Sequence, residues 1–308
     1  MKYYSYFPGC SAESTGRGLG LSAAAIAGPL DIELVEIEDW NCCGSTPYGS
    51  LDEEEAVVVA ARNLTLAEKA GFDVVTPCSS CYVTLSKANR HLHEHPAILA
   101  RVNEALGVAG LHYNGSLRVR HLVDVLVNDL TPDFIAARLK KPLNGLRVAA
   151  YYGCQLVRPD YGLDDTEQPV MLDRLVACLG AEAVDFPMKA RCCGGSLTLS
   201  EEASTLGLMQ KILKSAADNG AQCLATPCPL CQTNLDAYQS RVNSVFKTNY
   251  DMPVLFITQL IGLALGIDAK SLGLDANIVA TSDVILRERS DRENLSEKLS
   301  PTLTLQEK

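Results

Sequence analysis

Ten of the twelve cysteines in this chain form one pattern that is written twice. In each copy a Gly follows an adjacent cysteine pair, 34 residues separate that pair from a C-x2-C motif, and Thr-Pro precedes the motif. The copies are Cys10, Cys42, Cys43, Cys78 and Cys81, and Cys154, Cys192, Cys193, Cys228 and Cys231. Chance does not arrange rare residues in this way. The chain therefore consists of two related halves, each with five thiols to gather.

Charge and hydropathy narrow the classes of protein to which the chain can belong. The formal net charge is −10 and no basic stripe is present, which argues against binding of nucleic acid. The start of the chain lacks the pattern of a signal peptide. The apolar stretch 254–267 is too short and too polar to span a bilayer, so no direct membrane insertion is expected. These features predict a cytoplasmic protein, in which thiols stay reduced and serve metal binding or catalysis.

The order of expected elements is the same in both halves. Strands are expected at 3–7, 32–37 and 72–76 in the first half and at 147–152, 183–186 and 223–226 in the second. Late segments at 119–126 and 254–261 also match each other. Strands that alternate with helices predict an α/β fold with small, mostly parallel sheets flanked by helices. Each cysteine group follows a strand, so the thiols of one half should meet at the carboxyl edge of its sheet.

One helix per half is marked clearly by its ends. In the first half Ser50 is the expected N-cap, with Glu53 completing a capping box, and Gly71 is the expected C-terminal glycine. In the second half the corresponding helix should begin near Ser200 and end near Gly220. The first half is expected to carry an extra piece, roughly residues 89–115, before its late segment.

The doubled pattern predicts two tandem, pseudo-symmetric domains. We place the first at residues 1–143 and the second at residues 144–285, with the boundary at the turn-like sequence near Pro142 and Gly145. Residues 286–308 are polar and mixed in charge, and we expect them to form a tail outside the fold.

Five thiols at each site restrict what the site can hold. Structural zinc takes four ligands, and a standard cubane iron–sulfur cluster takes four cysteines. A fifth thiol, with two cysteines adjacent in sequence, suits a larger or irregular iron–sulfur cluster, because neighbouring cysteines point differently and can reach two irons. A thioredoxin-like interpretation of each C-x2-C motif would leave the other three cysteines of the set unexplained.

Three motifs resemble a known family. The sequences YFPGC ending at Cys10, WNCCG ending at Gly44 and TPCSSC ending at Cys81 are similar to those of the CCG-domain family, in particular the B-type subunit of heterodisulfide reductase. The resemblance covers about residues 1–268. It implies that each half binds a non-cubane [4Fe–4S] cluster through five cysteines. The ligands would be Cys10, Cys42, Cys43, Cys78 and Cys81 for one cluster, and Cys154, Cys192, Cys193, Cys228 and Cys231 for the other.

The resemblance also implies an activity and partners. Two nearby clusters would reduce a small disulfide, or form one from thiols, by paired one-electron steps. A ferredoxin-like iron–sulfur subunit and a flavin subunit are the implied partners in a complex. Two related alternatives are a sulfur-oxidation subunit that acts on a thiol or sulfane sulfur, and an electron-relay subunit of a lactate-, glycolate- or succinate-type oxidoreductase. A structural zinc or interaction protein is a third class, which metal analysis would distinguish.

Several other residues invite a functional interpretation. Cys178 and Cys223 have no counterpart in the other half and are expected to be buried free cysteines. His91, His93 and His95 lie in the extra piece and are expected on a solvated surface. The cations near the second motif are expected at the surface, although a substrate anion could use them, and these are Arg158, Lys189 and Arg191. The sequence 27–30 departs from the family pattern without touching the ligands.

Overall fold

Two parallel four-stranded sheets form the framework of the protein. The computed structural model describes residues 1–45, 49, 51–159, 162–282 and 284. The first sheet has the order β2-β1-β3-β4 and the second β6-β5-β7-β8, with parallel pairing throughout. The strands are β1 (Lys2–Tyr6), β2 (Ile32–Glu36), β3 (Val74–Thr76), β4 (Val119–His121), β5 (Arg147–Ala150), β6 (Glu182–Ala183), β7 (Cys223–Thr226) and β8 (Val254–Phe256). The predicted tandem α/β fold is thereby confirmed.

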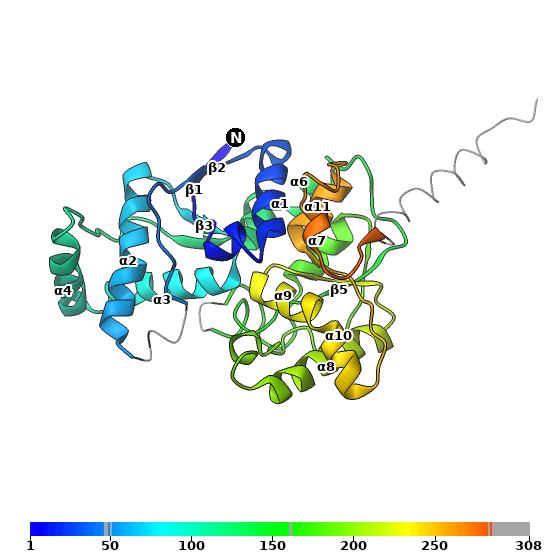
Figure 1. Ribbon diagram of the computed structural model, residues 1–308. Coiled ribbons are helices and arrows are strands. Elements are labelled where there is room, and N and C mark those ends of the chain that lie inside the picture. The colour runs from blue at the N-terminus through cyan, green and yellow to red at the C-terminus, as the bar shows by residue number, and fades with distance from the viewer. Residues whose placement is uncertain (46–48, 50, 160–161, 283, 285–308) are drawn as a thin grey trace, which may run out of the picture.

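Helices cover both faces of each sheet (Figure 1). In the first half they are η1 (Cys10–Glu13), α1 (Arg17–Ala27), η2 (Gly28–Leu30), α2 (Glu53–Ala70), α3 (Ser79–Glu94), α4 (Pro96–Gly107), α5 (Leu122–Asp124), η4 (Val125–Asp129) and α6 (Pro132–Ala136). In the second half they are α7 (Met171–Cys178), η5 (Gly195–Leu197), α8 (Glu202–Asp218), α9 (Pro229–Ala237), α10 (Gln239–Phe246), α11 (Ile257–Ala264) and η6 (Leu274–Ala276). Within the described residues, no helix is long and apolar enough to cross a membrane.

The ends of α2 differ in one respect from the sequence expectation. The prediction that Ser50 is the N-cap is wrong. Ser50 itself lies outside the described residues. The cap is Asp52, whose side chain accepts a hydrogen bond from the Glu55 amide at 2.9 Å. A carboxylate at this position satisfies a free amide and complements the positive end of the helix. The C-terminal end follows the prediction, since Gly71 has φ 76° in the left-handed region.

The segment 89–115 was expected to be an extra piece, but the second half has a shorter counterpart of its helix α4. Helix α4 packs on α2, and the shorter α10 packs on α8 in the second half. Both halves therefore carry a helix at this place, and the first half adds length to it. The predicted domain boundaries at 143 and 285 remain predictions, and the predicted tail 286–308 lies outside the described residues.

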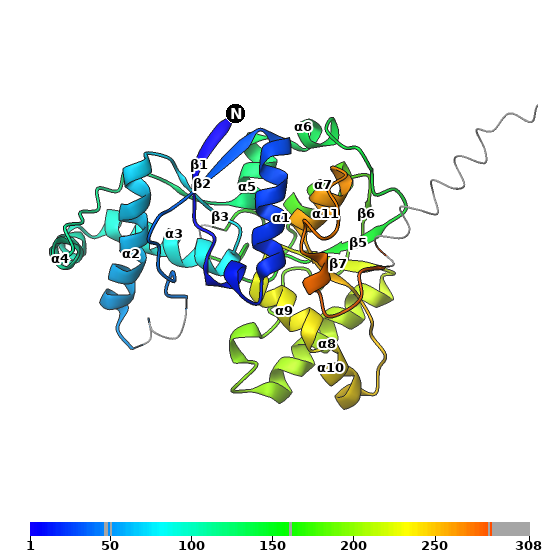
Figure 2. The ribbon, with the colours of Figure 1, turned by 45° about the horizontal axis from the view of Figure 1, so that its top comes forward.

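The two halves share a single central core. Helix α1 of the first half packs on α11 of the second, and Figure 2 shows it standing between the two sheets. The core cluster at this junction contains buried side chains of both halves, including Ile26, Leu126, Leu175 and Leu260. Each half has a second, separate core on the outer face of its sheet. The shared inner core fixes how the carboxyl edges of the two sheets lie relative to each other.

A buried hydrogen bond joins α1 to α11. Ser22 Oγ lies 2.6 Å from the Gly18 carbonyl oxygen and 2.6 Å from Thr258 Oγ1. A serine hydroxyl carries one proton, so Ser22 donates to Gly18 and accepts from Thr258.

We expect Ser22→Ala to lower the free energy of unfolding by about 1–3 kcal/mol, because the buried Thr258 hydroxyl would lose its acceptor. Thr258→Val should cost less, because Ser22 keeps its own acceptor. Adding Thr258→Val to Ser22→Ala should restore part of the loss, as measured by chemical denaturation. Equal and additive losses would contradict this direction of the hydrogen bond.

Candidate functional site: two five-cysteine clusters

All three cysteine groups of each half lie at the carboxyl edge of its sheet. In the first half Cys10 follows β1, the pair at 42–43 follows β2, and Cys78 follows β3. The second half repeats this with Cys154 after β5, the pair at 192–193 after β6, and Cys228 after β7. Parallel strands end on the same side of a sheet, so residues far apart in the sequence meet there.

The first site combines buried and exposed thiols. Cys43 Sγ lies 3.5 Å from Cys81 Sγ, and both side chains are buried together with Cys78. Cys10 Sγ lies 3.9 Å from Cys42 Sγ, and both of these cysteines are exposed. The five thiols therefore extend from the outer core of the first half to the surface.

The second site repeats the arrangement. Cys193 Sγ lies 3.5 Å from Cys231 Sγ, and both are buried, as is Cys228. Cys154 and the exposed Cys192 hydrogen-bond to each other, like the pair at the surface of the first site. The amide of Gly194 also donates to Cys192 Sγ at 3.3 Å.

A glycine before the first cysteine of each set leaves room for a thiol. Gly9 and Gly153 have φ 78° and 67°, which favour glycine. A Cβ atom on Gly9 would lie 2.8 Å from Cys81 Sγ, and one on Gly153 would lie 3.1 Å from Cys231 Sγ. Both the backbone conformation and the close approach of sulfur therefore require these glycines.

Each C-x2-C motif begins a helix. Cys78 and Cys228 are the N-caps of α3 and α9, and Cys81 and Cys231 lie in the first turns. The amide of Cys78 donates to the hydroxyl of Thr76, and the amide of Cys228 donates to that of Thr226, each at 3.4 Å. The positive end of a helix stabilises thiolates placed there.

Hydrogen bonds between neighbouring thiols separate their pKa values. Hydrogen bonds from Cys42 and then Cys81 lower the pKa of Cys43 to about 3. A hydrogen bond from Cys154 lowers the pKa of Cys192 to about 6. The pKa values of Cys42 and Cys154 rise in turn, because each donates its proton to the neighbouring thiolate. At neutral pH each site therefore contains a thiolate, which is the form of cysteine that binds metals.

The sulfur separations suit shared coordination of metal better than disulfide bonds. All twelve cysteines are free, and a disulfide would need its sulfurs at about 2.05 Å. Two thiolates that each lie about 2.3 Å from one tetrahedral metal are roughly 3.8 Å apart, close to the observed 3.5 and 3.9 Å. Among the described residues, no three metal-binding side chains are arranged around a single ion. The thiols instead form connected rows, in which Cys81 neighbours both Cys43 and Cys78 and Cys231 neighbours both Cys193 and Cys228. Soft thiolates grouped in this way fit an iron–sulfur cluster.

The remaining cysteines, and the histidines of the segment 89–115 that face solvent, lie apart from these sites, whereas the buried His121 lies 3.5 Å from the Ser79 hydroxyl within the first C-x2-C motif. Cys223 is buried in β7 and Cys178 is half-buried at the end of α7, and burial raises their pKa values to about 12 and about 11. On α3, the rings of His91 and His95 stack with centroids 4.4 Å apart. His93 is exposed and hydrogen-bonds to the Gly115 carbonyl at 3.0 Å.

One of the basic residues near the second site is not at the surface, contrary to expectation. Lys189 is 7% exposed and forms ion pairs with Asp173 at 3.3 Å and Asp185 at 3.1 Å. These two carboxylates compensate the burial of its charge inside the second half. Arg158 and Arg191 are both exposed, as expected.

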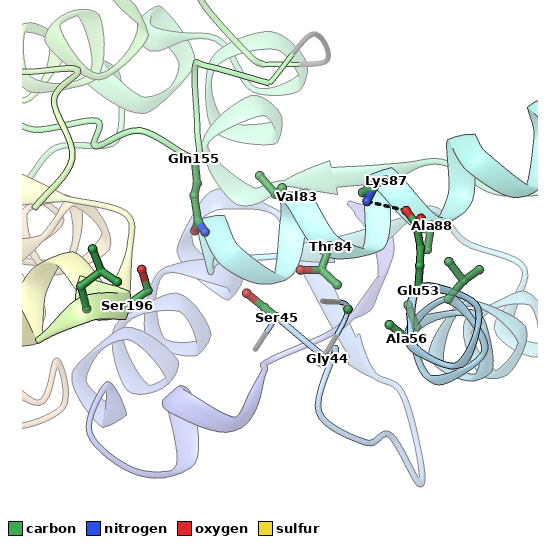
Figure 3. A pocket seen from close by; sticks show the side chains of 14 residues that line it. Gly44, Ser45, Glu53, Ala56, Val83, Thr84, Lys87, Ala88, Gln155 and Ser196 are labelled. Atoms are coloured by element: carbon green, nitrogen blue, oxygen red, sulfur yellow. Dashed lines mark hydrogen bonds and ion pairs between the residues drawn. The ribbon is translucent and has the colours of Figure 1, made fainter. Parts of the chain in front are cut away.

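The structure also reveals cavities that the cysteine pattern did not predict. A small cavity beside the second site is lined by Ser79 of the first half as well as by Tyr152, Gln155 and Leu230 of the second. The Ser80 hydroxyl donates to the Gln155 side chain across the junction of the halves. A larger groove runs from this junction along α2 and α3 (Figure 3). In the sequence, its polar residues look like ordinary helix-surface residues.

Comparisons with known proteins agree with the doubled architecture. The model of the CCG cysteine-rich domain matches residues 4–86 and again residues 148–236. The chain is 37% identical over 281 residues to the 8-methylmenaquinol:fumarate reductase membrane anchor subunit of Wolinella succinogenes, covering 91% of this chain and 98% of that one. It is 32% identical over 292 residues to the B-type subunit of the ferredoxin/F420H2-dependent CoB-CoM heterodisulfide reductase of Methanosarcina acetivorans, covering 93% and 97%.

A solved structure shares the fold. The crystal structure of a hypothetical protein from Helicobacter pylori aligns with a TM-score of 0.74 at 20% identity, covering 90% of this chain and 52% of that chain. At this identity the likeness concerns the fold alone.

We expect Gly9→Ala to reduce the iron bound at the first site, because the added methyl group would displace Cys81. Gly153→Ala should have a smaller effect at the second site, where the contact distance is longer. Gly71→Ala is the matched control, since it has φ 76° and a Cβ there would meet nothing within 4 Å. Iron and acid-labile sulfide per chain measure the effect, and equal losses in Gly71→Ala would contradict a role for the sulfur contact.

Proposed function

The chain belongs to the family of CCG cysteine-rich domain proteins, and we propose that it is an iron–sulfur redox subunit that reduces, or reversibly forms, a disulfide. Two non-cubane [4Fe–4S] clusters would each be held by five cysteines. The proposed ligands are Cys10, Cys42, Cys43, Cys78 and Cys81 for one, and Cys154, Cys192, Cys193, Cys228 and Cys231 for the other. The closely spaced thiols and the thiolate at each site, described above, support this assignment.

The observation that carries the proposal is the junction between the two sites. Residues of both halves line the small cavity beside the second site. Ser79, which lies between Cys78 and Cys81 of the first set, borders this cavity together with Cys154 and Cys192. The groove likewise has Gly44 and Ser45 on one side and Ser196 on the other. A small molecule bound there would lie within reach of both sites.

The overall reaction consumes two electrons and two protons and converts R–S–S–R′ into R–SH and R′–SH. When bound, the clusters would supply the electrons one at a time. The protein's own contribution is to hold the substrate sulfurs between the two sites and to restrict access of water. The Gly194 amide, which donates to Cys192, is positioned to tune the redox properties of the second site.

A second candidate is an electron-relay subunit of a fumarate- or succinate-type oxidoreductase. The identity of 37% to the Wolinella fumarate reductase subunit, which exceeds the 32% to the heterodisulfide reductase subunit, favours it. In either case the electrons come from another subunit. We propose a ferredoxin-like iron–sulfur subunit and a flavin subunit as partners, and a cytoplasmic location.

Iron analysis of single-cysteine variants tests the cluster assignment. The protein purified without oxygen should contain about eight irons, as expected for two four-iron clusters. Cys42→Ala and Cys193→Ala should each retain about half, because each removes a ligand from one site only. Cys178→Ala is the control and should keep the full content. Unchanged iron in both ligand variants, or stoichiometric zinc in place of iron, would contradict the assignment.

Turnover separates the two candidate functions. Given reduced viologen as the electron donor, a disulfide-reducing subunit should release two thiols per disulfide, and Cys193→Ala should lower the rate at least about tenfold. A protein with both clusters that leaves a range of small disulfides unreduced would support the relay function.

A further inference from the structure

A groove of about 570 Å³ extends from the junction of the two halves along the surface of the first. This volume is in the range typical of small-molecule sites. Helices α2 and α3 form its walls together with Gly44, Ser45 and Gly49, and residues of the second half close one end. Figure 3 shows Ser196 and Gln155 at that end, Thr84 and Ser45 in the middle, and Lys87 with Glu53 at the other end.

The middle of the groove touches the first cysteine site. Gly44 and Ser45 follow Cys43 directly, and both line the groove. The Thr84 side chain, which lines the opposite wall, lies next to the Cys43 sulfur. A sulfur atom of a ligand placed between Ser45 and Thr84 would therefore lie next to this site.

The far end carries one positive and one negative charge. Lys87 Nζ lies 3.0 Å from Glu53 Oε1, and both side chains are 63% exposed. Among the described residues that line the groove, these two are the only charged ones. Small apolar side chains, Ala56, Val57 and Ala60 among them, lie along the wall from α2. An exposed ion pair of this kind contributes little to stability, so its groups can exchange partners with a ligand.

The charged pair is specific to the first half. An offset of 150 residues superposes the two cysteine patterns from the adjacent pair onward, and it places Ala203 and Ala237 where Glu53 and Lys87 stand. The fold of the second half therefore forms without such a pair. The pair is therefore not a requirement of the shared fold, and it is available to recognise one particular ligand end.

We propose that this groove binds a small thiol or disulfide that ends in a zwitterionic amino-acid group. The inference rests on the proposed function, and it adds the substrate class and its orientation. The ligand's carboxylate would pair with Lys87 and its ammonium group with Glu53, while its sulfur lies near Ser45 and Thr84. A ligand end with a single type of charge would gain one of these contacts and meet the like charge of the other residue.

Three disulfides of similar size test this charge preference by calorimetric binding to the oxidised, iron-loaded protein without oxygen. Cystine is zwitterionic at both ends, cystamine is a dication, and 3,3′-dithiodipropionate is a dianion. The protein should bind cystine about fivefold or more tightly than either of the others, as expected for the loss of one partly exposed charge contact.

Single variants should move this preference in opposite directions. Lys87→Met should shift it toward cystamine, and Glu53→Gln should shift it toward dithiodipropionate. The double variant Glu53→Lys with Lys87→Glu should recover cystine binding, because the pair is restored in reverse. Lys214→Met removes a cation from a surface pair with Asp218 outside the groove and is the matched control.

The outcomes distinguish this inference from the proposed function. Equal affinity for the three disulfides, or an unchanged order in both single variants, overturns the zwitterion site even if iron content and disulfide turnover are normal. Absence of iron from the purified protein would overturn the proposed function instead. Neither Glu53 nor Lys87 is among the cysteines proposed to hold the clusters, so variants of either residue should keep full iron content.

Discussion

The convergence of parallel strand ends is the constraint on which the sites depend. Cysteines separated by more than 30 residues come together because β1, β2 and β3 end on the same edge of one sheet, and the second half repeats this with β5, β6 and β7. The helix that starts at each C-x2-C motif then brings one thiol of the motif into contact with the buried member of the adjacent pair. A change in the register of one strand would separate these sulfurs.

The packing of the halves turns two separate sites into one functional surface. Helices α1 and α11 meet in the central core and share the buried Ser22–Thr258 hydrogen bond. This contact keeps both carboxyl edges close enough that Ser79 and Ser80 of the first half meet Gln155 of the second. The inner core therefore supports the chemistry by fixing the position of one site relative to the other.

Much of this organisation could be predicted from the sequence. The doubled cysteine pattern indicates two α/β halves, and glycines such as Gly71 mark helix ends through their backbone freedom. The start of α2 was misplaced, because Ser and Asp are both favoured N-cap residues, and it is the Asp52 side chain that accepts the hydrogen bond from the Glu55 amide. The burial of Lys189 was missed because one of its two carboxylate partners, Asp173, lies in α7 and meets it only in the folded protein. The groove was missed because Glu53 and Lys87 meet only when α2 and α3 pack together.

Thiol labelling tests the central claim, ligation by ten cysteines, most directly. Cys10, Cys42 and Cys192 are exposed, so folding alone would leave them open to iodoacetamide. Mass spectrometry should find these three unlabelled in the iron-loaded protein and labelled once a chelator has removed the iron. Rapid labelling of all three while the iron content stays complete would contradict ligation at both sites.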